Sequence, residues 1–451
     1  MENLDFETMQ DKLFEMLEKR QMKQLKNALD EMNGFDVAEF LTELDQPKMP
    51  MIFRMLSKEH AAEVFADLEI EEQEYIINSI TDKELSGIVE ELYVDDAVDM
   101  MEELPANVVK RVMRAATPET RNLINQYLKY PENSAGSIMT AEFVDLKKYM
   151  NVRESIARIR RIGEDKETIY NCFVTSADRR LEGVVTVKDL LLADDEDVVE
   201  DIMDKNVIFC TTTDDQEEVS GIFSDYDLLA VPVVDTEGRL VGIVTVDDVI
   251  DVMEQEATED MEKMAAILPS EKPYLRTGVF AMVKNRIPWL LVLMFSSMLS
   301  STILMHYETA YIAVPLLTVL MPMLTGTGGN AGSQASTLAI RGLATGELEL
   351  GDIIKILWKE FRVGFVCGFL LAAVNFVRIW LTYGSVGIAA TMAIALLATV
   401  ILAKTIGSAL PFAAKACRLD PAVMASPFIT TIVDAVALIV YFNVAKLLLG
   451  V

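Results

Sequence analysis

One acidic residue in the last apolar segment of the chain is the first position where chemistry is expected. The segment reads PFITTIVDAVALIVYF over residues 427–442, and Asp434 is the single charged residue between Asp420 and Lys446. An ionised carboxylate at the centre of a bilayer costs at least about 2.5 kcal/mol, and intramembrane carboxylates are functional by default. We expect Asp434 to bind a cation, and the alternative is an ion pair with Arg378 or Lys404.

A glycine-rich stretch, LTGTGGNAGSQASTLAIRG over residues 324–342, is the second candidate. Glycine makes a regular helix costly, and irregular backbone at membrane depth is tolerated only where it is buried in protein or lines a water-filled cavity. We therefore expect freed carbonyls near Gly328 and Gly329, together with the Asn330 amide, to be ligands in an ion path. A packing face of small residues, Gly328 and Gly332, is an alternative that is compatible with this role.

The available ligand types favour a hard cation. The chain has only two histidines and four scattered cysteines without a CxxC pair, so neither a transition-metal site nor a disulfide framework is expected. Carboxylate and carbonyl oxygens suit magnesium or calcium, and magnesium tends to keep several of its waters. A single intramembrane Asp can hold such a hydrated ion through its waters, with a second copy supplied by a symmetric dimer.

The distribution of charge separates a cytosolic front from a membrane-spanning rear. The first 275 positions carry 63 acidic and 28 basic residues, whereas only seven acidic residues follow Lys272. Uncharged runs in the rear are long enough to span a bilayer, which takes about 20 residues. We predict five transmembrane helices at residues 287–306, 310–334, 361–382, 386–410 and 425–447.

Orientation follows from the short loops. Lys and Arg gather before the first of these helices, between the second and third, and between the fourth and fifth, whereas HYETAY and TYGSVG on the other side have none. Basic loops face the cytosol. We therefore expect cytosolic N-terminal domains and an external C-terminus in the plasma membrane, which is the inner membrane of a cell with two. The charged N-terminus is not a signal peptide.

Two sets of internal repeats organise the front. AEFLTEL at 38–44 returns as AEVFADL at 62–68, within a helical pattern that predicts an all-α superhelix of short helices. Further on, LEGVVTVKDLL at 181–191 matches LVGIVTVDDVI at 240–250. Strand, turn, strand and helix, occurring twice, resemble a tandem CBS pair, a regulatory module that often senses adenine nucleotides or ions. ATP is therefore a candidate ligand, with the Tyr170 ring available to stack on adenine.

Four motifs carry a resemblance that covers nearly the whole chain. GTGGNAGSQASTLAIRGLATGEL, DPAVMASPFITTIVDAV, VTVDDVIDVMEQEATEDMEK and YPENSAGSIMT resemble the MgtE family of magnesium channels. The resemblance implies a homodimeric, multidomain integral membrane protein, with no enzymatic activity. It has a helical N domain at 1–130, tandem CBS domains at 131–253, a connecting plug helix and linker at 254–275, and a five-helix transmembrane domain at 276–451.

The same resemblance assigns two sets of ion-binding residues. The pore set is Asp434, Asn330, Gly328, Gly329 and Thr430. The regulatory set, where bound magnesium bridges the N domain, the CBS pair and the plug helix, is Glu63, Asp95, Asp99, Glu217, Asp227, Asp248, Asp251, Glu256, Glu259 and Asp420. Without divalent cations these like charges repel and splay the domains apart, and with them the assembly closes.

The predicted function is a magnesium-selective channel that passes Mg²⁺ down its electrochemical gradient and is closed by cytosolic Mg²⁺. The sequence contains no GxxxxGK[ST] motif, so an ATP-driven pump is not expected, and no nucleic-acid partner is expected either. A proton-coupled secondary transporter with Asp434 as the proton carrier is the alternative. An intramembrane aspartyl protease needs two membrane carboxylates per site, and only one deeply placed Asp is present.

Overall fold

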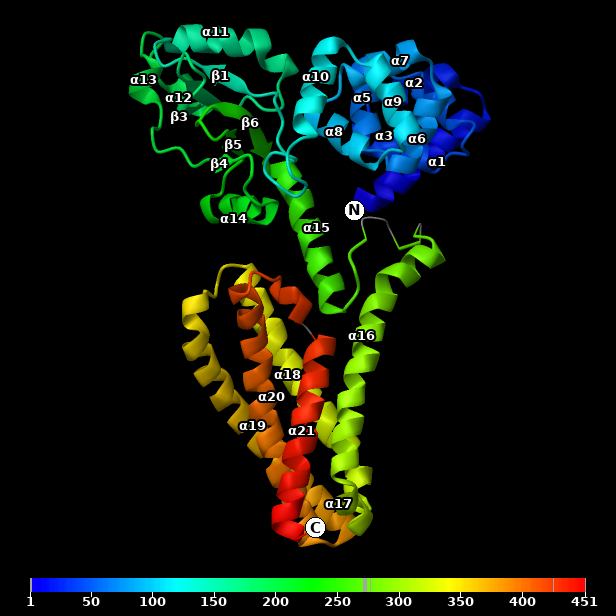
Figure 1. Cartoon of the computed structure of the whole chain (residues 1–451). Helices are drawn as coiled ribbons and strands as arrows, with labels where there is room; N and C mark the ends of the chain where they lie inside the picture. Colours follow the sequence, from blue (N-terminus) through cyan, green and yellow to red (C-terminus); the bar gives the residue numbers. More distant parts are fainter. Residues whose placement is uncertain (1, 271–273, 276, 425, 451) are drawn as a thin grey trace. The chain divides into compact units, whose positions relative to one another are not determined.

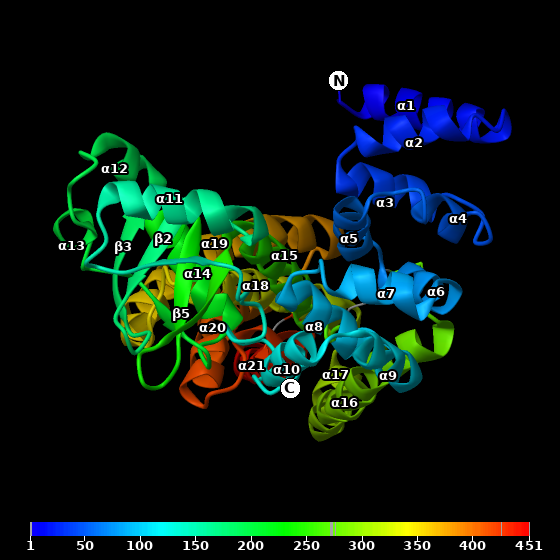
Figure 2. The ribbon, with the colours of Figure 1, turned by 90° about the horizontal axis from the view of Figure 1, so that it is seen from above.

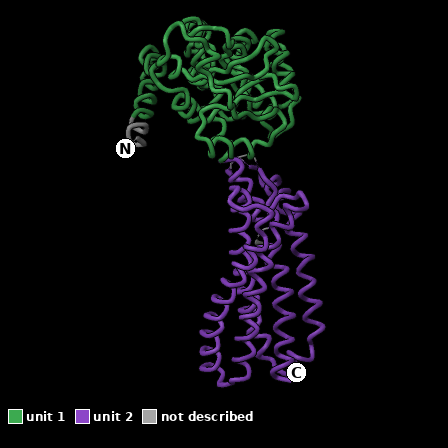
Figure 3. The backbone as a smooth tube through the Cα atoms, turned by 90° about the vertical axis from the view of Figure 1, so that its left-hand side faces the viewer, with its two compact units in different colours: residues 1–253 green, residues 254–451 purple. Residues whose placement is uncertain are grey.

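The computed structural model describes residues 2–270, 274–275, 277–424 and 426–450. The chain forms two compact units, residues 1–253 and residues 254–451, coloured separately in Figure 3. The first unit contains a helical region followed by two small β-sheets, and the second is a bundle of long helices (Figure 1). The predicted fold class, a helical N domain, a CBS pair and a set of apolar C-terminal helices, is confirmed.

Short helices stacked in sequence order build the start of the first unit. α3 contacts α5, α5 contacts α7 and α7 contacts α9, so that the helices follow one another in layers (Figure 2). The described helices here are α1 (Glu2–Glu18), α2 (Met22–Asp30), α3 (Gly34–Thr42), α4 (Met49–Phe53), α5 (Lys58–Ala66), α6 (Ile70–Ser79), α7 (Asp82–Val89), α8 (Val94–Glu103), α9 (Ala106–Ala115) and α10 (Pro118–Tyr127).

The repeated sequence pattern explains this stacking. The copies at 38–44 and 62–68 overlap α3 and α5, and each places a phenylalanine, Phe40 or Phe65, in the core. Local signals set the ends of the helices: Thr81 caps α7 in a reciprocal capping box with Glu84, and Pro118 occupies the first position of α10. Each copy of the seven-residue motif therefore falls on one helix, and a second, α4 or α6, follows it before the next motif position.

The two CBS repeats form two three-stranded sheets of the same topology. In each, the first strand is parallel to the second, and the second is antiparallel to the third. The elements are β1 (Val144–Leu146), α11 (Val152–Ile162), η1 (Gly163–Asp165), β2 (Asn171–Thr175), β3 (Leu181–Thr186), α12 (Val187–Leu192) and α13 (Val199–Ile202), then β4 (Cys210–Thr211), α14 (Gln216–Tyr226), β5 (Ala230–Val234), β6 (Leu240–Thr245) and α15 (Val246–Met264).

The duplicated motif ends each sheet in the same way. Thr186 donates a hydrogen bond to Asp189 at 2.5 Å where β3 becomes α12, and Thr245 donates to Asp248 at 2.6 Å where β6 becomes α15. Phe173 and Ile243, from the two sheets, belong to one small buried cluster. The two repeats therefore pack against each other. The helix that follows the second sheet, α15, is one continuous helix that extends as far as Met264.

Long apolar helices make up the second unit, in which α18 to α21 run side by side (Figure 1). The elements are α16 (Val279–His306), α17 (Glu308–Ala313), α18 (Leu316–Ala344), η2 (Leu350–Asp352), α19 (Ile353–Tyr383), α20 (Val386–Ala416), η3 (Pro421–Met424) and α21 (Ser426–Leu449). Among the described residues, four segments are long and apolar enough to cross a membrane: Val279–His306, Leu350–Tyr383, Val386–Ala416 and Pro421–Leu449.

The second predicted span differs from its prediction at both ends. In place of one helix over 310–334, the chain forms the short α17, turns at Pro315, and then forms α18 as far as Ala344. The glycines, threonines and Asn330 of α18 lower its hydropathy, which explains why it is not among the four apolar segments although it has 29 residues. The helix ends at Ala344, beyond the predicted end at residue 334. Its last three turns carry polar residues, so an apolar pattern does not reveal them as part of the helix.

Candidate functional site

The glycine-rich stretch is a regular part of helix α18. The expected break in the backbone is therefore absent, and the carbonyls of Gly328 and Gly329 belong to a continuous helix. A Cβ atom on Gly328 would lie 2.7 Å from Thr399 of α20, and one on Gly329 would lie 3.1 Å from Thr430 of α21. Close packing between the helices offsets the low helix propensity of glycine here. Gly328 and Gly332 therefore belong to a small-residue packing face, as the alternative interpretation of this stretch expects.

The tightest contact in the bundle is between α18 and α20. A Cβ atom on Gly407 would overlap the carbonyl oxygen of Gly332, so no residue with a side chain fits at this position without moving the backbone. A Cβ atom on Gly332 would itself lie 2.9 Å from Ile429 and 3.1 Å from Val433, both on α21. The three helices therefore approach one another at glycine positions, which fixes α18 beside the helix that carries Asp434.

Asp434 is half-buried on α21, one turn beyond Thr430. Successive contacts pair Gly328 with Val433, Gly329 with Thr430 and Gly332 with Ile429, so α18 and α21 run in opposite directions. Asn330 follows Gly329 on α18 and is exposed in the single chain. The structure thus brings Gly329 and Thr430 into contact and sets Asn330 and Asp434 on the two helices that meet there.

The alternative partners of Asp434 are engaged elsewhere. Lys404 is buried on α20 and lies 3.8 Å from Glu360 of α19, and Arg378 donates a hydrogen bond to Asn375 at 3.2 Å. Within the described part of the chain, Asp434 has no hydrogen-bond or ion-pair partner. The structure therefore does not form the alternative ion pair between Asp434 and Arg378 or Lys404. The Lys404–Glu360 pair is not expected from the sequence.

The exposed residues in the middle of α18, between the exposed apolar residues Val319 and Leu338, include polar ones. Gly326, Asn330 and Gln334 follow one another at four-residue intervals, and Asn330 is exposed in the single chain. Lipid cannot satisfy amide groups at membrane depth, so such residues face protein or water. Asn330 and Gln334 are therefore expected to face protein or water rather than lipid.

Acidic side chains gather where α8 of the helical region approaches the start of α15. Burial, followed by repulsion from Asp96 and Asp248, raises the pKa of Asp95 well above its usual range. Burial raises the pKa of Asp96 to about 7, with repulsion from Asp248 as the next cause. The pKa of Asp248 rises to about 6, also through burial, although the hydrogen bond from Thr245 opposes the shift. Three carboxylates therefore share one region and repel one another.

Two further carboxylates extend this group. Burial raises the pKa of Glu167 to about 8, with repulsion from Asp247 and Asp248 adding to the shift. Burial and repulsion from Asp96 raise the pKa of Asp99 to about 7, although its side chain remains open to solvent and is therefore partly screened. Asp96 and Asp247 adjoin predicted residues in VDDA and VDDV, so the sequence carries a signal for both. It carries none for Glu167.

Of the other predicted regulatory residues, Asp251 lies near enough to act on Asp248, and Glu63 acts on Tyr93 together with Asp95. Glu63 lies 3.2 Å from His60 on α5, and Asp251 is one turn beyond Asp248 on α15. Glu217 and Asp227 lie at the two ends of α14. In the second unit, Glu256 and Glu259 are on the far half of α15, and Lys263 bridges Glu259 to Asp420 at 2.6 and 2.7 Å.

Acidic residues approach one another without forming a ready-made metal cage. Over residues 2–270, 274–275, 277–424 and 426–450, no group of three or more His, Cys, Asp or Glu side chains is arranged to hold a metal ion. The donor set is nevertheless the one that hard, hydrated divalent cations prefer. A cation arriving between α8 and α15 would find carboxylates whose mutual repulsion it can relieve.

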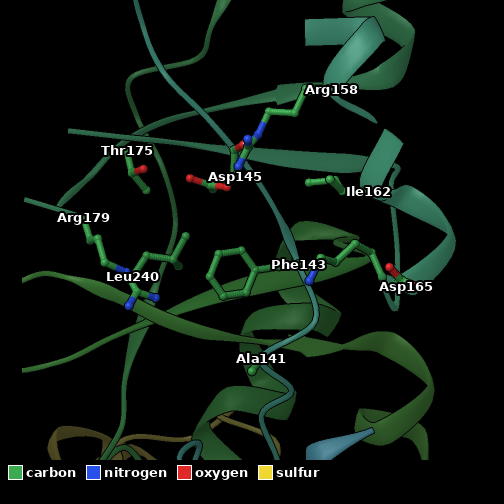
Figure 4. A pocket seen from close by; sticks show the side chains of 10 residues that line it. Ala141, Phe143, Asp145, Arg158, Ile162, Asp165, Thr175, Arg179 and Leu240 are labelled. Atoms are coloured by element: carbon green, nitrogen blue, oxygen red, sulfur yellow. Dashed lines mark hydrogen bonds and ion pairs between the residues drawn. The ribbon is translucent and has the colours of Figure 1, made fainter. Parts of the chain in front are cut away.

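The CBS pair contains a pocket of about 510 Å³. Arg158 of α11 is directed at Asp145 of β1 and forms an ion pair with it, while Thr175 and Arg179 lie on the other side (Figure 4). Tyr170, the ring expected to stack on adenine, is 66% exposed and does not line this pocket. The pocket and the predicted stacking residue are therefore separate features.

Three family models match successive parts of this chain. The MgtE intracellular N domain matches residues 32–133, the CBS domain matches residues 135–196 and 199–255, and the MgtE divalent cation transporter model matches residues 321–444. The magnesium transporter MgtE of Thermus thermophilus is 36% identical over 443 residues, which are 97% of this chain and 98% of that protein. This chain belongs to the MgtE family.

Other MgtE proteins agree with this membership. The magnesium transporter MgtE of Bacillus subtilis is 29% identical over 99% of this chain and 98% of that protein. Among solved structures, the soluble part of a magnesium transporter covers 56% of this chain and 99% of its own, with 31% identity and a TM-score of 0.54. The cytosolic domain of the Mg²⁺ channel MgtE in complex with ATP covers 53% of this chain and 98% of its own, with 38% identity and a TM-score of 0.51. The likeness in structure thus concerns the first unit of this MgtE chain.

Proposed function

We propose that this MgtE chain forms a homodimeric, magnesium-selective channel that passes Mg²⁺ into the cell and is closed by cytosolic Mg²⁺. The observation that carries the proposal is Asp434, a carboxylate in an apolar helix that has no partner among the described residues. Its helix packs on the glycine face of α18, and Asn330, the residue after Gly329, is exposed. A transported cation supplies the missing charge compensation.

The ion path in this proposal lies between two copies of the chain. A two-fold axis along the polar side of α18 would cover that side and bring a second Asp434 to the path. Mg²⁺ keeps several waters, so the two carboxylates, the Asn330 amides and the Thr430 hydroxyls would hold the hydrated ion rather than strip it. The carbonyls of Gly328 and Gly329, being helical, are assigned a spacing role in place of the expected ligand role.

Orientation and driving force follow from charge. Short loops rich in Lys and Arg face the cytosol. In the proposed orientation, residues 1–130, 131–253 and 254–275 are therefore cytosolic and the C-terminus is external. A divalent ion entering at about −100 mV gains about 4.6 kcal/mol, at roughly 2.3 kcal/mol for each charge. No chemical energy source is needed for influx.

Closure is assigned to the acidic group between α8 and α15. Asp95, Asp99 and Asp248 would hold cytosolic Mg²⁺ there, together with Asp96 and Glu167. Burial, and after it mutual repulsion, raises the pKa values of these carboxylates, and a bound cation relieves the repulsion. We also assign regulatory Mg²⁺ binding to the other acidic residues that the family resemblance indicates, which are Glu63, Glu217, Asp227, Asp251, Glu256, Glu259 and Asp420. Mg²⁺ shifts the channel toward closure only as far as it binds the closed assembly better than the open one.

ATP is proposed as a second ligand of the CBS pair. The support is the related cytosolic domain crystallised in complex with ATP, together with the matching CBS repeats of this chain. Tyr170 is open to solvent and accessible for stacking on an adenine ring. The relatives are described as transporters, and no reaction is assigned to either ligand.

The competing function is a proton-coupled transporter that uses Asp434 as its proton carrier. The experiment that separates the two measures Mg²⁺ uptake into liposomes with equal pH on both sides and a pH-sensitive dye in the lumen. The proposed channel takes up Mg²⁺ driven by membrane potential, with no change in lumenal pH. Uptake that stalls, or that alkalinises the lumen in step with Mg²⁺ entry, would instead establish proton exchange.

A further inference from the structure

Lys263 occupies an unusual position in the second unit, near the end of α15. Its ammonium nitrogen lies 2.6 Å from Glu259, on the same helix, and 2.7 Å from Asp420, in the connection between α20 and α21. The next residue, Met264, packs against Ile340 of α18 and Ala422 of η3. One lysine and one methionine therefore fasten the connecting helix to the cytosolic end of the helix bundle.

The surroundings of this lysine carry an excess of negative charge. Asp260 is close enough for Asp420, Glu256 and Glu259 to act on it, so Lys263 is one cation among several carboxylates. Lysine is a compact ammonium on a flexible stem, and its side chain here is 23% exposed. It is thus able to leave the pair of carboxylates and return to it without unfolding the helix.

An ammonium and a hydrated divalent cation compete for the same oxygens. Carboxylates bind Mg²⁺ directly at about 2.0 to 2.1 Å or through its waters, and in either case the ion takes the space between the two acidic groups. Lys263 fills that space between Glu259 and Asp420. A divalent cation binding there must displace the lysine, and it brings one more positive charge than the ammonium.

We propose that Lys263 is a built-in competitor of the regulatory cation, which sets the Mg²⁺ concentration at which the ion occupies the Glu259–Asp420 pair. The inference rests on the proposed regulation by cytosolic Mg²⁺. At low Mg²⁺ the tethered ammonium occupies the Glu259–Asp420 pair, and at high Mg²⁺ the ion replaces it. Removing the ammonium leaves two uncompensated carboxylates, which makes the pair a better cation site.

The direction of the effect distinguishes competition from a simple structural ion pair. In Lys263→Met, a competitor role predicts that closure occurs at a Mg²⁺ concentration lower than in wild type by about three- to tenfold, because a like charge next to the site is lost. Lys263→Arg keeps the charge and should stay within about twofold of wild type. If the ion pair merely stabilises the closed state, Lys263→Met shifts closure to higher Mg²⁺.

The test titrates Mg²⁺ on the cytosolic face of inside-out patches that contain the full-length wild type, Lys263→Met, Lys263→Arg, Asp420→Asn, and Lys263→Met combined with Asp420→Asn. Protection of the full-length protein from proteolysis near residue 268, measured over the same Mg²⁺ range, gives a readout that does not require conduction. The proposal expects a shift to lower Mg²⁺ in Lys263→Met, and no further shift from that change once Asp420→Asn is present.

Two kinds of failure are distinguishable. A wild-type channel that conducts but ignores cytosolic Mg²⁺ removes the regulation on which the inference rests. Normal closure of the wild type, with Lys263→Met closing at the same or a higher Mg²⁺ concentration, overturns the competitor role alone. If Lys263→Met does not fold, Lys263→Gln serves in its place, since glutamine also removes the charge and suits a helix.

Discussion

The two charged regions of this protein are built on opposite principles. Between α8 and α15, several carboxylates are placed close together, and burial and mutual repulsion raise their pKa values. In the membrane bundle, Asp434 stands on α21, and an added Cβ atom at the glycines of α18 that face this helix would lie 2.9 to 3.1 Å from its side chains. In the first arrangement the carboxylates repel one another, and an added cation would reduce that repulsion. The second is a closely packed frame around a carboxylate that has no partner among the described residues, which suits conduction rather than sensing.

Neutralising the charge inside the closely packed frame should have the largest effect on transport. Asp434→Asn keeps the shape of the side chain but removes the charge that the cation compensates, so Mg²⁺ influx should fall by about ten- to a hundredfold. Fluorescent Mg²⁺ uptake into liposomes measures the loss, and size-exclusion chromatography checks that dimer and fold survive. Wild-type flux from correctly folded Asp434→Asn would move the ion path away from α21.

Loosening the frame itself should lower stability before it changes selectivity. Gly407→Ala forces a Cβ atom into the carbonyl group of Gly332, so α18 and α20 must separate, at a cost of about 1 to 3 kcal/mol or more. Thermal unfolding in detergent gives the loss as a lower Tm. Gly387→Ala is the matched control on the same helix, because its Cβ atom meets only ordinary contact, at 3.4 Å from Leu449. Equal Tm values for both variants would contradict the packing role of Gly407.

Removing carboxylates from the acidic region should change regulation and leave conduction intact. Asp95→Ala combined with Asp99→Ala weakens cation binding but also relieves repulsion in the ion-free state, so the two effects partly cancel. We expect closure at a Mg²⁺ concentration higher by about three- to tenfold, the range that corresponds to about 1 kcal/mol of lost differential binding. Cytosolic Mg²⁺ titration in patches measures it. Closure unchanged from wild type would make these acidic residues solubility features.

The smallest effect should be a pH dependence confined to the acidic region. The pKa values of Asp248, Asp96 and Glu167 are raised by folding, to about 6, 7 and 8, so the folded unit holds protons more tightly than the unfolded chain. Their contribution to stability is therefore present below about pH 4 and is lost as the pH rises through about 6 to 8. In EDTA the first thermal transition should come a few degrees lower at pH 8 than at pH 5.5.

Added Mg²⁺ provides the control for that pH effect. At pH 8 the ion replaces the missing protons and should restore the transition, whereas at pH 5.5 it should change it little, because the carboxylates are already largely protonated. Asp96→Asn should reduce the pH dependence in EDTA. A transition that is equally stable at both pH values without divalent cations would contradict the repulsion inferred between α8 and α15.

Sequence patterns predict the parts of the molecule that depend on local or repeated signals. The helical copies at 38–44 and 62–68, and the duplicated strand-to-helix motif with Thr186 and Thr245, each form the expected element. Asp434 is identifiable because a lone charge in an apolar helix is conspicuous. These signals involve residues close to one another in the chain, so their consequences follow without knowledge of the tertiary contacts.

Other features depend on partners that the sequence does not reveal. The glycines of α18 favour a broken helix, yet contacts with Thr399, Gly407 and Thr430 from two other helices keep it regular. Glu167 joins the acidic region although it is far from both Asp96 and Asp248 in the chain. Lys263 reaches Asp420 across an even longer stretch of sequence. Long-range packing decides each of these cases.

The measurement that tests the central claim most directly is a Mg²⁺ titration on the cytosolic face of an inside-out patch, with Mg²⁺ as the only permeant cation on the other side. In the proposed mechanism, the ion conducted past Asp434 is also the ion that closes the channel through the acidic region. We expect an inward Mg²⁺ current at low cytosolic Mg²⁺ that falls to near zero as Mg²⁺ reaches about millimolar levels, the range of weak carboxylate sites. A current that is independent of cytosolic Mg²⁺, or no Mg²⁺ current at any concentration, would contradict it.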